Sequence, residues 1–138
     1  MTSIVDRIPR RAIHPFHAAM LAGAAPLFLG VLLADYAYWS SYQIEWSNFA
    51  SWLLVGALVL AAIALACAVV DLFRGRRRTV YTVLLAATWL AGFFNALIHA
   101  RDAWAIMPAA LVLSVLAAVL ACAATWIGFS GLRAGGVE

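Results

Sequence analysis

The side chains that could do chemistry in this chain gather in one stretch, FFNALIHARDAW, at residues 93–104. This stretch places an amide, an imidazole and an Arg-Asp pair in an otherwise apolar sequence: Asn95, His99, Arg101 and Asp102. Asn95, His99 and Asp102 are spaced by four and then three residues, so a helix would present them on one face. Polar groups on one helix face can bind a proton or a ligand, or hydrogen-bond to a second helix.

The amino-acid composition indicates whether these side chains belong to a water-soluble protein or to a membrane protein. Hydrophobic residues make up 67% of the 138 residues and charged residues 11%, and the mean hydropathy is +0.98. A soluble domain of this size needs more polar surface, so the sequence predicts an integral membrane protein. All nine basic residues are arginines, mostly in short clusters, which are typical of membrane topology signals rather than of nucleic-acid binding.

Four apolar runs are long enough to cross a membrane, since a hydrocarbon core of about 30 Å needs about 20 helical residues. The runs cover residues 17–39, 49–73, 80–100 and 105–129. Their short links make consecutive helices antiparallel neighbours. The sequence therefore predicts an all-α, polytopic membrane protein: a single domain over residues 1–138, with four transmembrane helices in an antiparallel up-down bundle. A polar loop is expected at Ser40–Asn48 and a kink at Pro26.

The placement of the arginines predicts the orientation of the bundle, because cytoplasmic segments carry an excess of positive charge. Arg7, Arg10 and Arg11 precede the first run, and the turn RGRRR at residues 74–78 joins the second run to the third. The other two links hold only Arg101. Both termini are therefore expected in the cytoplasm, with the chain in a bacterial-type inner membrane.

The sequence has no nucleotide-binding loop, zinc-ligand spacing or hydrolase nucleophile elbow. Cys67 and Cys122 fall within apolar runs. We expect them to be small buried residues without a disulfide. Nothing in the sequence therefore indicates catalysis, and enzyme activity is not expected.

The ionisable and amide residues sort by depth into two layers. The predicted outer polar layer comprises Asp35, Asn95, His99, Arg101 and Asp102, and the predicted inner polar layer comprises His14, His17 and Asp71. We expect Asp35 to pair with Asn95 or His99, and Asp71 with His14, His17 or the arginine turn. Two interpretations stay open at this point. The layers are interhelical clasps, each contributing on the order of 1 kcal/mol, or one of them binds a proton, a quinone headgroup or another ligand.

Haem and metal sites need ligands at one depth. His14 and His17, which are expected on one helix face, are separated from His99 by nearly the membrane thickness. A haem held by His99 with Met107, or a copper site of His14, His17 and Met20, is chemically allowed, but helical methionine more often fills packing gaps. No metal or other cofactor is therefore expected, with haem b or a quinone at Asp35, Asn95 and His99 as the alternative.

Four segments carry a family resemblance: IHPFHAAMLAGAAPLFLGVLLADYAYW, VVDLF, FFNALIHARDAWAIMPAALVLS and TWIGFSGL. Together they resemble a bacterial membrane-protein family catalogued as domain of unknown function number 2231, from Ile13 to about Leu132. The resemblance implies a four-helix membrane protein and no assigned activity. Its marked positions fall on His14, Pro15, Asp35, Asp71, Asn95, His99, Arg101, Asp102, Trp104, Pro108, Ser114, Trp126 and Gly128. The chain departs from the family in its ending, GFSGLRAGGVE, where members often continue with a glycine-rich turn, a Tyr and a His; His17 is also peculiar to this sequence.

With so little polar surface, lateral helix contacts are the main means of recognition open to this chain. We expect a small accessory or structural subunit in the lipid bilayer that packs against a larger membrane-protein complex, of the redox or electron-transport type, or against itself. The alternative is a membrane redox protein that binds haem or quinone at the outer polar layer. Nucleic acid is not an expected partner.

Overall fold

The computed structural model describes residues 13–76 and 78–130, which form four long helices without a strand. The helices are α1 (Pro15–Ser41), α2 (Ile44–Phe73), α3 (Thr79–His99) and α4 (Ala109–Ser130), and a short 3-10 helix, η1 (Ala103–Ala105), precedes α4. Each of the four is long and apolar enough to cross a membrane. The prediction of an all-α protein with four membrane-spanning helices is therefore confirmed.

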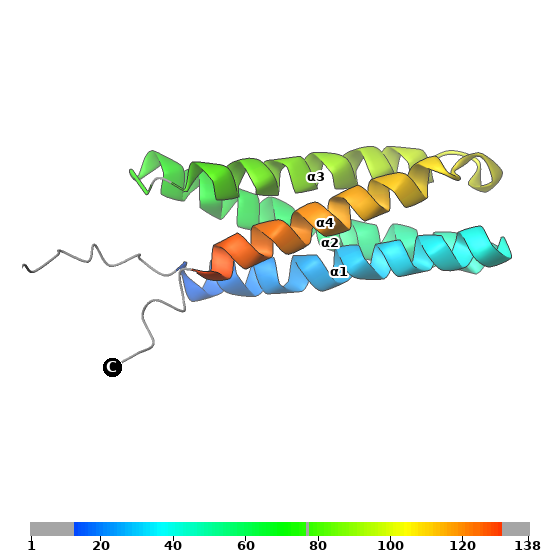
Figure 1. Cartoon of the computed structure of the whole chain (residues 1–138), viewed down its shortest axis with the longest axis horizontal. Coiled ribbons are helices and arrows are strands. Elements are labelled where there is room, and N and C mark those ends of the chain that lie inside the picture. Colours follow the sequence, from blue (N-terminus) through cyan, green and yellow to red (C-terminus); the bar gives the residue numbers. More distant parts are fainter. Residues whose placement is uncertain (1–12, 77, 131–138) are drawn as a thin grey trace, which may run out of the picture.

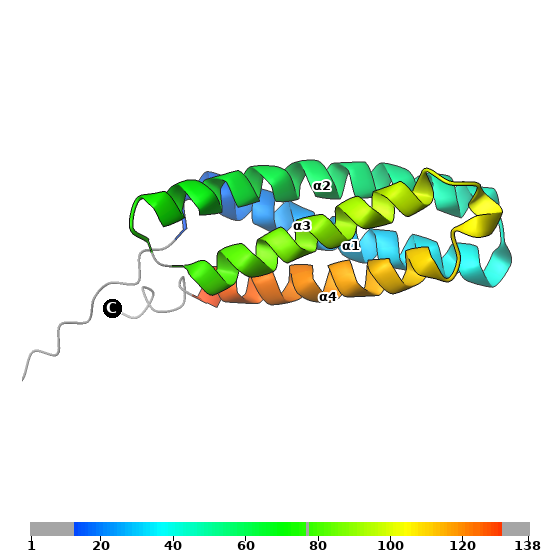
Figure 2. The ribbon, with the colours of Figure 1, turned by 90° about the horizontal axis from the view of Figure 1, so that it is seen from above.

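The helices run up and down alternately, so that the bundle has two distinct ends (Figure 1). The α1–α2 turn and the α3–α4 connection lie at one end, here called the Asp102 end. The α2–α3 turn and the described chain ends, Ile13 and Ser130, lie at the other, here called the Arg76 end (Figure 2). Around the bundle, α1 packs against α2 and α4, and α3 packs against α2 and α4, so α1 and α3 face each other across the diagonal.

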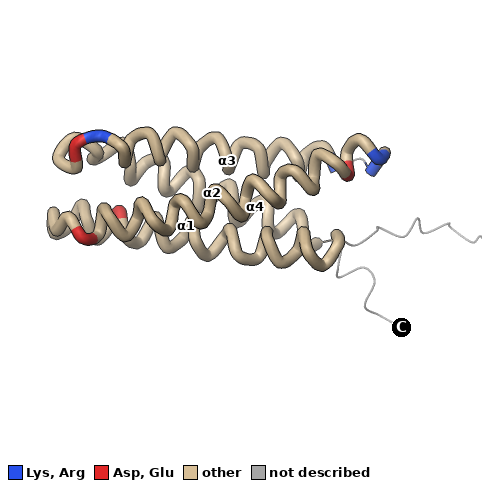
Figure 3. Tube along the Cα trace, turned by 180° about the vertical axis from the view of Figure 1, so that it is seen from behind, with Lys and Arg blue, Asp and Glu red and all other residues tan. Residues whose placement is uncertain are grey.

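The described Arg, Asp and Glu residues lie toward these two ends of the bundle (Figure 3). The middle of every helix is apolar apart from small hydroxyl groups such as that of Thr88, which donates to the Leu84 carbonyl in its own helix. A bond to its own helix satisfies this hydroxyl without a partner on a neighbouring helix.

The core of the bundle is built mainly from small residues. The buried face of α2 repeats alanine at 50, 57, 61, 64 and 68. Larger side chains such as Val59 and Leu90 point outward instead. In a bilayer, lipid tails are as apolar as these side chains, so tight van der Waals contact between helices replaces the burial of large residues as the source of stability.

Two of the predicted boundaries differ clearly from the structure. The polar loop expected at Ser40–Asn48 is wrong, since α1 and α2 are separated only by Tyr42 and Gln43. Tyr42 adopts a left-handed conformation, with a φ of 54°, and its backbone N–H donates to the Tyr38 carbonyl, which reverses the chain at once. The fourth helix begins at Ala109 rather than at residue 105, because the preceding residues form η1.

The remaining fold predictions have mixed outcomes. α1 continues as one helix through Pro26. Cys67 is partly buried, but Cys122 is exposed on the bundle surface, so its predicted burial is wrong. Both thiols are free, as expected. A surface position costs little in a membrane helix, because a thiol facing lipid behaves as a small apolar group.

Candidate functional site

A buried polar contact joins Asp35 of α1 to His99 of α3 across the diagonal. The His99 Nε2 atom lies 2.8 Å from Asp35 Oδ1, and the two side chains are 3% and 0% exposed. Asp35 sits six residues before the end of α1, and His99 is the last residue of α3. Two ionisable groups are thus enclosed by protein at the Asp102 end of the membrane-spanning region.

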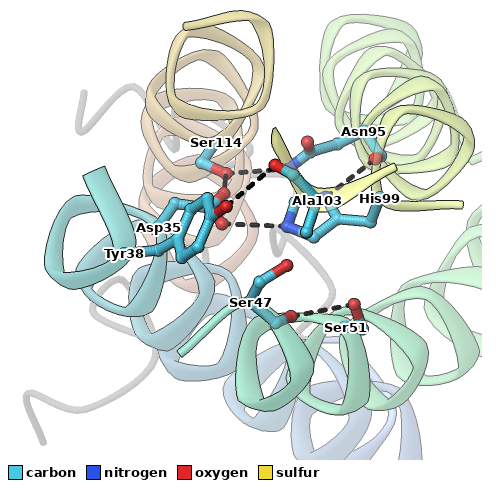
Figure 4. A network of polar contacts seen from close by, with 8 residues as sticks. All are labelled: Asp35, Tyr38, Ser47, Ser51, Asn95, His99, Ala103 and Ser114. Atoms are coloured by element: carbon cyan, nitrogen blue, oxygen red, sulfur yellow. Dashed lines mark hydrogen bonds and ion pairs between the residues drawn. The ribbon is translucent and has the colours of Figure 1, made fainter. Parts of the chain in front are cut away.

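Asn95 and Ser114 close this contact into a ring (Figure 4). The Asn95 Nδ2 donates to Ser114 Oγ at 2.7 Å, and the Ser114 hydroxyl donates to Asp35 Oδ2. His99 Nδ1 lies 3.0 Å from the backbone carbonyl of Asn95. We call these four residues, Asp35, Asn95, His99 and Ser114, the Asp35 ring. It ties α1, α3 and α4 together at one level.

The hydrogen bonds of the Asp35 ring restrict where its protons lie. A backbone carbonyl only accepts, so His99 Nδ1 must carry a proton. One further proton lies between His99 Nε2 and Asp35 Oδ1, on either atom. The pair is therefore a protonated imidazole with a carboxylate or a neutral imidazole with a carboxylic acid, and its net charge is zero in both arrangements. Neutrality matters here, because an uncompensated charge is costly in hydrocarbon.

Further groups surround the Asp35 ring. Tyr38, one turn beyond Asp35, donates its hydroxyl to the Ala103 carbonyl at 2.9 Å and so ties α1 to η1. Ile106 is fully buried beside it. Ser47 of α2 points its hydroxyl toward the ring (Figure 4). The whole arrangement draws on all four helices and is covered by the α3–α4 connection.

One polar atom of the ring is left over. Asn95 Oδ1 is buried and has no hydrogen-bond partner among the described residues. An acceptor left without a partner in an apolar interior costs about 1–3 kcal/mol. The Asp35 ring therefore contains one buried acceptor without a partner among the described residues.

The predicted outer polar layer divides into two parts. Asp35, Asn95 and His99 belong to the ring. Arg101 and Asp102 lie outside it and are exposed. Asp102 accepts a hydrogen bond from the Trp104 backbone N–H at 3.2 Å and so caps η1. Asp102 therefore shapes the start of η1, and neither Arg101 nor Asp102 belongs to the Asp35 ring.

The members of the predicted inner polar layer form hydrogen bonds with different partners. His14 precedes α1 and accepts a hydrogen bond from the Phe16 backbone N–H at 3.2 Å, so it is an exposed helix cap. The expectation that His14 and His17 share one helix face is therefore wrong. Asp71 pairs with Arg76 of the arginine turn at 2.9 Å, which is one of its expected partners.

His17 instead makes a second diagonal contact between α1 and α3. Its Nε2 atom lies 2.7 Å from the Tyr81 hydroxyl, and both residues are buried. We call the His17–Tyr81 and Asp35–His99 contacts the two diagonal clasps. His17 lies 18 residues before Asp35, and Tyr81 lies 18 residues before His99, so the two diagonal clasps are about 27 Å apart along the bundle. The structure therefore holds α1 and α3 together by one polar pair near each end.

Sequence reasoning missed Ser114, Tyr81 and Ser47 as members of polar contacts. Ser114 had a signal, as one of few polar residues in the last apolar run and as a position marked by the family resemblance. Tyr81 lies near the start of its run, where an aromatic residue is typical of the membrane interface. The pairing of side chains across a diagonal depends on how each helix is rotated about its axis. The sequence does not specify this rotation.

The metal and haem alternatives meet a direct obstacle in this geometry. Both ring nitrogens of His99 are hydrogen-bonded, so binding an iron would require breaking one of these bonds. Within residues 13–76 and 78–130, His, Cys, Asp and Glu side chains nowhere gather in groups of three as metal ligands do. The proposed copper ligands His14, His17 and Met20 also do not converge, since His14 is an exposed helix cap and His17 is hydrogen-bonded to Tyr81.

Comparison with known protein families agrees with the prediction of a membrane protein. No curated protein and no solved structure matches the chain. The family model of the predicted membrane proteins DUF2231 matches residues 13–136, which include all four helices and both diagonal clasps. The chain therefore belongs to the DUF2231 family of predicted membrane proteins.

Proposed function

We propose that this chain is a small multi-pass membrane subunit without catalytic activity, which packs laterally against a larger membrane-protein partner of the redox or electron-transport type. The observation that carries the proposal is the closure of the Asp35 ring. Both nitrogens of His99 and both carboxyl oxygens of Asp35 bond within the bundle. Groups that satisfy each other in this way serve to hold the helices in register.

The lipid-facing sides of the helices are the surface that can recognise a partner protein. On α4, Val112, Val119 and Trp126 recur every seven residues and point outward. On α2, Trp52, Val59 and Phe73 form a similar outward row. Rows of this kind can pack against a helix of a partner or of a second copy of the chain, since an interval of seven keeps side chains near one helix face.

Photo-crosslinking in the host membrane tests this proposal. A benzoylphenylalanine side chain is placed in turn at one outward position on each helix: Leu33, Val59, Val83 and Val119. A lateral partner gives an adduct of discrete mass from one helix or from two neighbouring helices. Adducts with lipid alone at all four positions would contradict the proposal.

The proposal includes no cofactor, and the haem or quinone alternative predicts a different result. The absorption spectrum and the solvent extract of the purified chain distinguish them. A Soret band that disappears in His99→Ala would support b-type haem at the Asp35 ring. A quinone recovered in a one-to-one ratio would support the quinone form, and neither signal is expected if the ring is a clasp.

We further propose that the Arg76 end faces the cytoplasm of a bacterial inner membrane. The support is the distribution of the arginines: Arg101 is the only one of nine in the sequence that belongs to the α1–α2 or α3–α4 connection. Short loops rich in arginine stay on the cytoplasmic side during insertion.

A further inference from the structure

The α2–α3 turn carries the described arginines of the Arg76 end, which are Arg74, Arg76 and Arg78 (Figure 3). The Arg74 side chain is exposed and forms no ion pair with a described residue. Arg76 is 35% exposed, and its Nη1 atom donates to Asp71 Oδ1 at 2.9 Å. A guanidinium group has five N–H donors, so Arg76 retains donors for a further acceptor. Asp71 therefore neutralises only part of the positive charge of this turn.

The backbone of this turn is held by the way in which α2 ends. Gly75 adopts a left-handed conformation, with a φ of 77°, and its N–H donates to the Leu72 carbonyl at 3.1 Å. The Arg76 N–H donates to the Asp71 carbonyl at 3.0 Å, which completes a Schellman motif. Two Cα–Cα steps of about 3.8 Å join Arg74 to Arg76, so their Cα atoms lie within about 8 Å of each other. Two guanidinium groups that start so close together can bond to the same phosphate group.

The turn lies at the level of the lipid headgroups. The two diagonal clasps are about 27 Å apart, close to the hydrocarbon thickness of about 30 Å, and α3 begins only two residues before Tyr81. On the lipid-facing side of α2, Phe73 is 87% exposed and Val70 is 47% exposed. Val70 precedes Arg74 by four residues, so the two lie on one helix face. An exposed apolar surface therefore leads directly to the charge of Arg74.

We propose that the α2–α3 turn binds one anionic phospholipid of the leaflet at the Arg76 end, with the lipid phosphate on Arg74 and Arg76. An acyl chain of this lipid lies along Val70 and Phe73. Guanidinium groups bind phosphate oxygens through charge-assisted hydrogen bonds, and arginines at the end of a membrane helix attract anionic headgroups. Asp71 competes with the phosphate for Arg76. The lipid site is independent of the lateral partner and of the orientation proposed above, because it needs only the leaflet in which this turn lies.

Native mass spectrometry of the full chain in detergent tests the lipid site, with phosphatidylglycerol and phosphatidylcholine of identical acyl chains as competing probes. The wild-type chain is expected to retain phosphatidylglycerol in preference to phosphatidylcholine. Arg74→Gln is expected to lower this preference about fivefold, the equivalent of about 1 kcal/mol for one arginine near an anionic surface. Asp71→Asn is expected to raise the preference by a similar factor, because Arg76 then has no competing carboxylate. The matched control is Arg101→Gln, an exposed arginine at the Asp102 end, which is expected to leave the preference unchanged.

Photolabelling locates the lipid. Phosphatidylglycerol with a diazirine near the glycerol end of its acyl chain is expected to label residues 70–80 in the wild-type chain and to label them less in Arg74→Gln. Labelling elsewhere, or equal losses of preference in Arg74→Gln and Arg101→Gln, would overturn the proposal. A preference in Asp71→Asn that does not exceed that of the wild type would exclude Arg76 from the site. A protein that co-purifies with the wild type and is lost from Arg74→Gln, with lipid retention unaltered, would assign the turn to a protein contact instead.

Discussion

Asp35 and His99 form a buried pair whose net charge stays zero wherever their shared proton lies. Ser114 and the Asn95 backbone carbonyl fix the outer atoms of the two side chains, which leaves the proton between Nε2 and Oδ1 as the one variable. A carboxyl group in the spanning region is tolerated here because each of its oxygens is bonded. The pattern of donors and acceptors, rather than charge itself, is what the site requires.

Substitution of Asp35 tests this pattern directly. In Asp35→Asn, the amide Nδ2 can donate to a neutral His99 and its carbonyl can accept from Ser114, so the free energy of unfolding should change by less than about 0.5 kcal/mol. Asp35→Val leaves both neighbours without a partner and should lower it by about 2 kcal/mol. Unfolding in mixed micelles, as the fraction of dodecyl sulfate rises, gives both values. Equal losses in the two variants would show that the site requires charge.

A double-mutant cycle measures the coupling between the two side chains. Asp35→Val and His99→Leu should each destabilise the bundle, and the double variant should lose about 1 kcal/mol less than the sum, because the second substitution removes a group already left without its partner. The control is Asp102→Ala combined with His99→Leu, since Asp102 lies outside the ring. If the losses of unfolding free energy in the two single variants add up in the double variant, the hydrogen bond between Asp35 and His99 is contradicted.

At the level of helices, small residues set how closely the four elements approach. Gly92 of α3 faces Phe28 of α1 in the middle of the bundle. A Cβ atom built there would lie 2.8 Å from Phe28 Cε1 and 3.0 Å from Leu58 Cδ2. The Phe28 ring thus reaches across the diagonal to the backbone of α3, at a level between the His17–Tyr81 and Asp35–His99 contacts.

Gly92→Val should therefore push α3 away from the core and lower the free energy of unfolding by about 1–3 kcal/mol. Phe28→Leu in the same chain should restore part of this loss, because it removes ring atoms from the crowded side. Val83→Leu, an exposed position on the same helix, serves as the control and should change little. Unfolding in mixed micelles gives the free energy of unfolding of the wild type and of the three variants. A Gly92→Val chain of wild-type stability would refute the close contact between Gly92 and Phe28.

At the level of the whole molecule, the bundle is asymmetric along the membrane normal. The Arg76 end holds the arginine turn with its Asp71–Arg76 pair, and the Asp102 end holds the Asp35 ring beneath an aromatic cover. Tyr42 and Trp104 stack there with their ring centres 6.0 Å apart. Amphipathic rings suit the headgroup region, so each end has the side chains of a membrane interface.

Cysteine labelling tests the proposed orientation. In a chain whose Cys67 and Cys122 are replaced by Ala, Asp102→Cys should react with a membrane-impermeant maleimide in intact cells. Thr79→Cys, at the start of α3, should react only after the membrane is permeabilised, because the arginine turn remains inside. The reverse pattern would place the arginine turn outside. A buried position such as Ala61→Cys provides the unreactive control.

The sequence alone determined the four apolar spans and the level of each polar residue along the bundle, because a helix rises by about 1.5 Å per residue and about 20 residues cross the hydrocarbon. It also singled out Asp35, Asn95 and His99. Only the tertiary structure decided that Ser114 completes the ring and that His17 faces Tyr81. Partner choice within a layer depends on the rotation and order of the helices, which small-residue packing such as that at Gly92 fixes, and a uniformly apolar sequence carries little periodic signal for it.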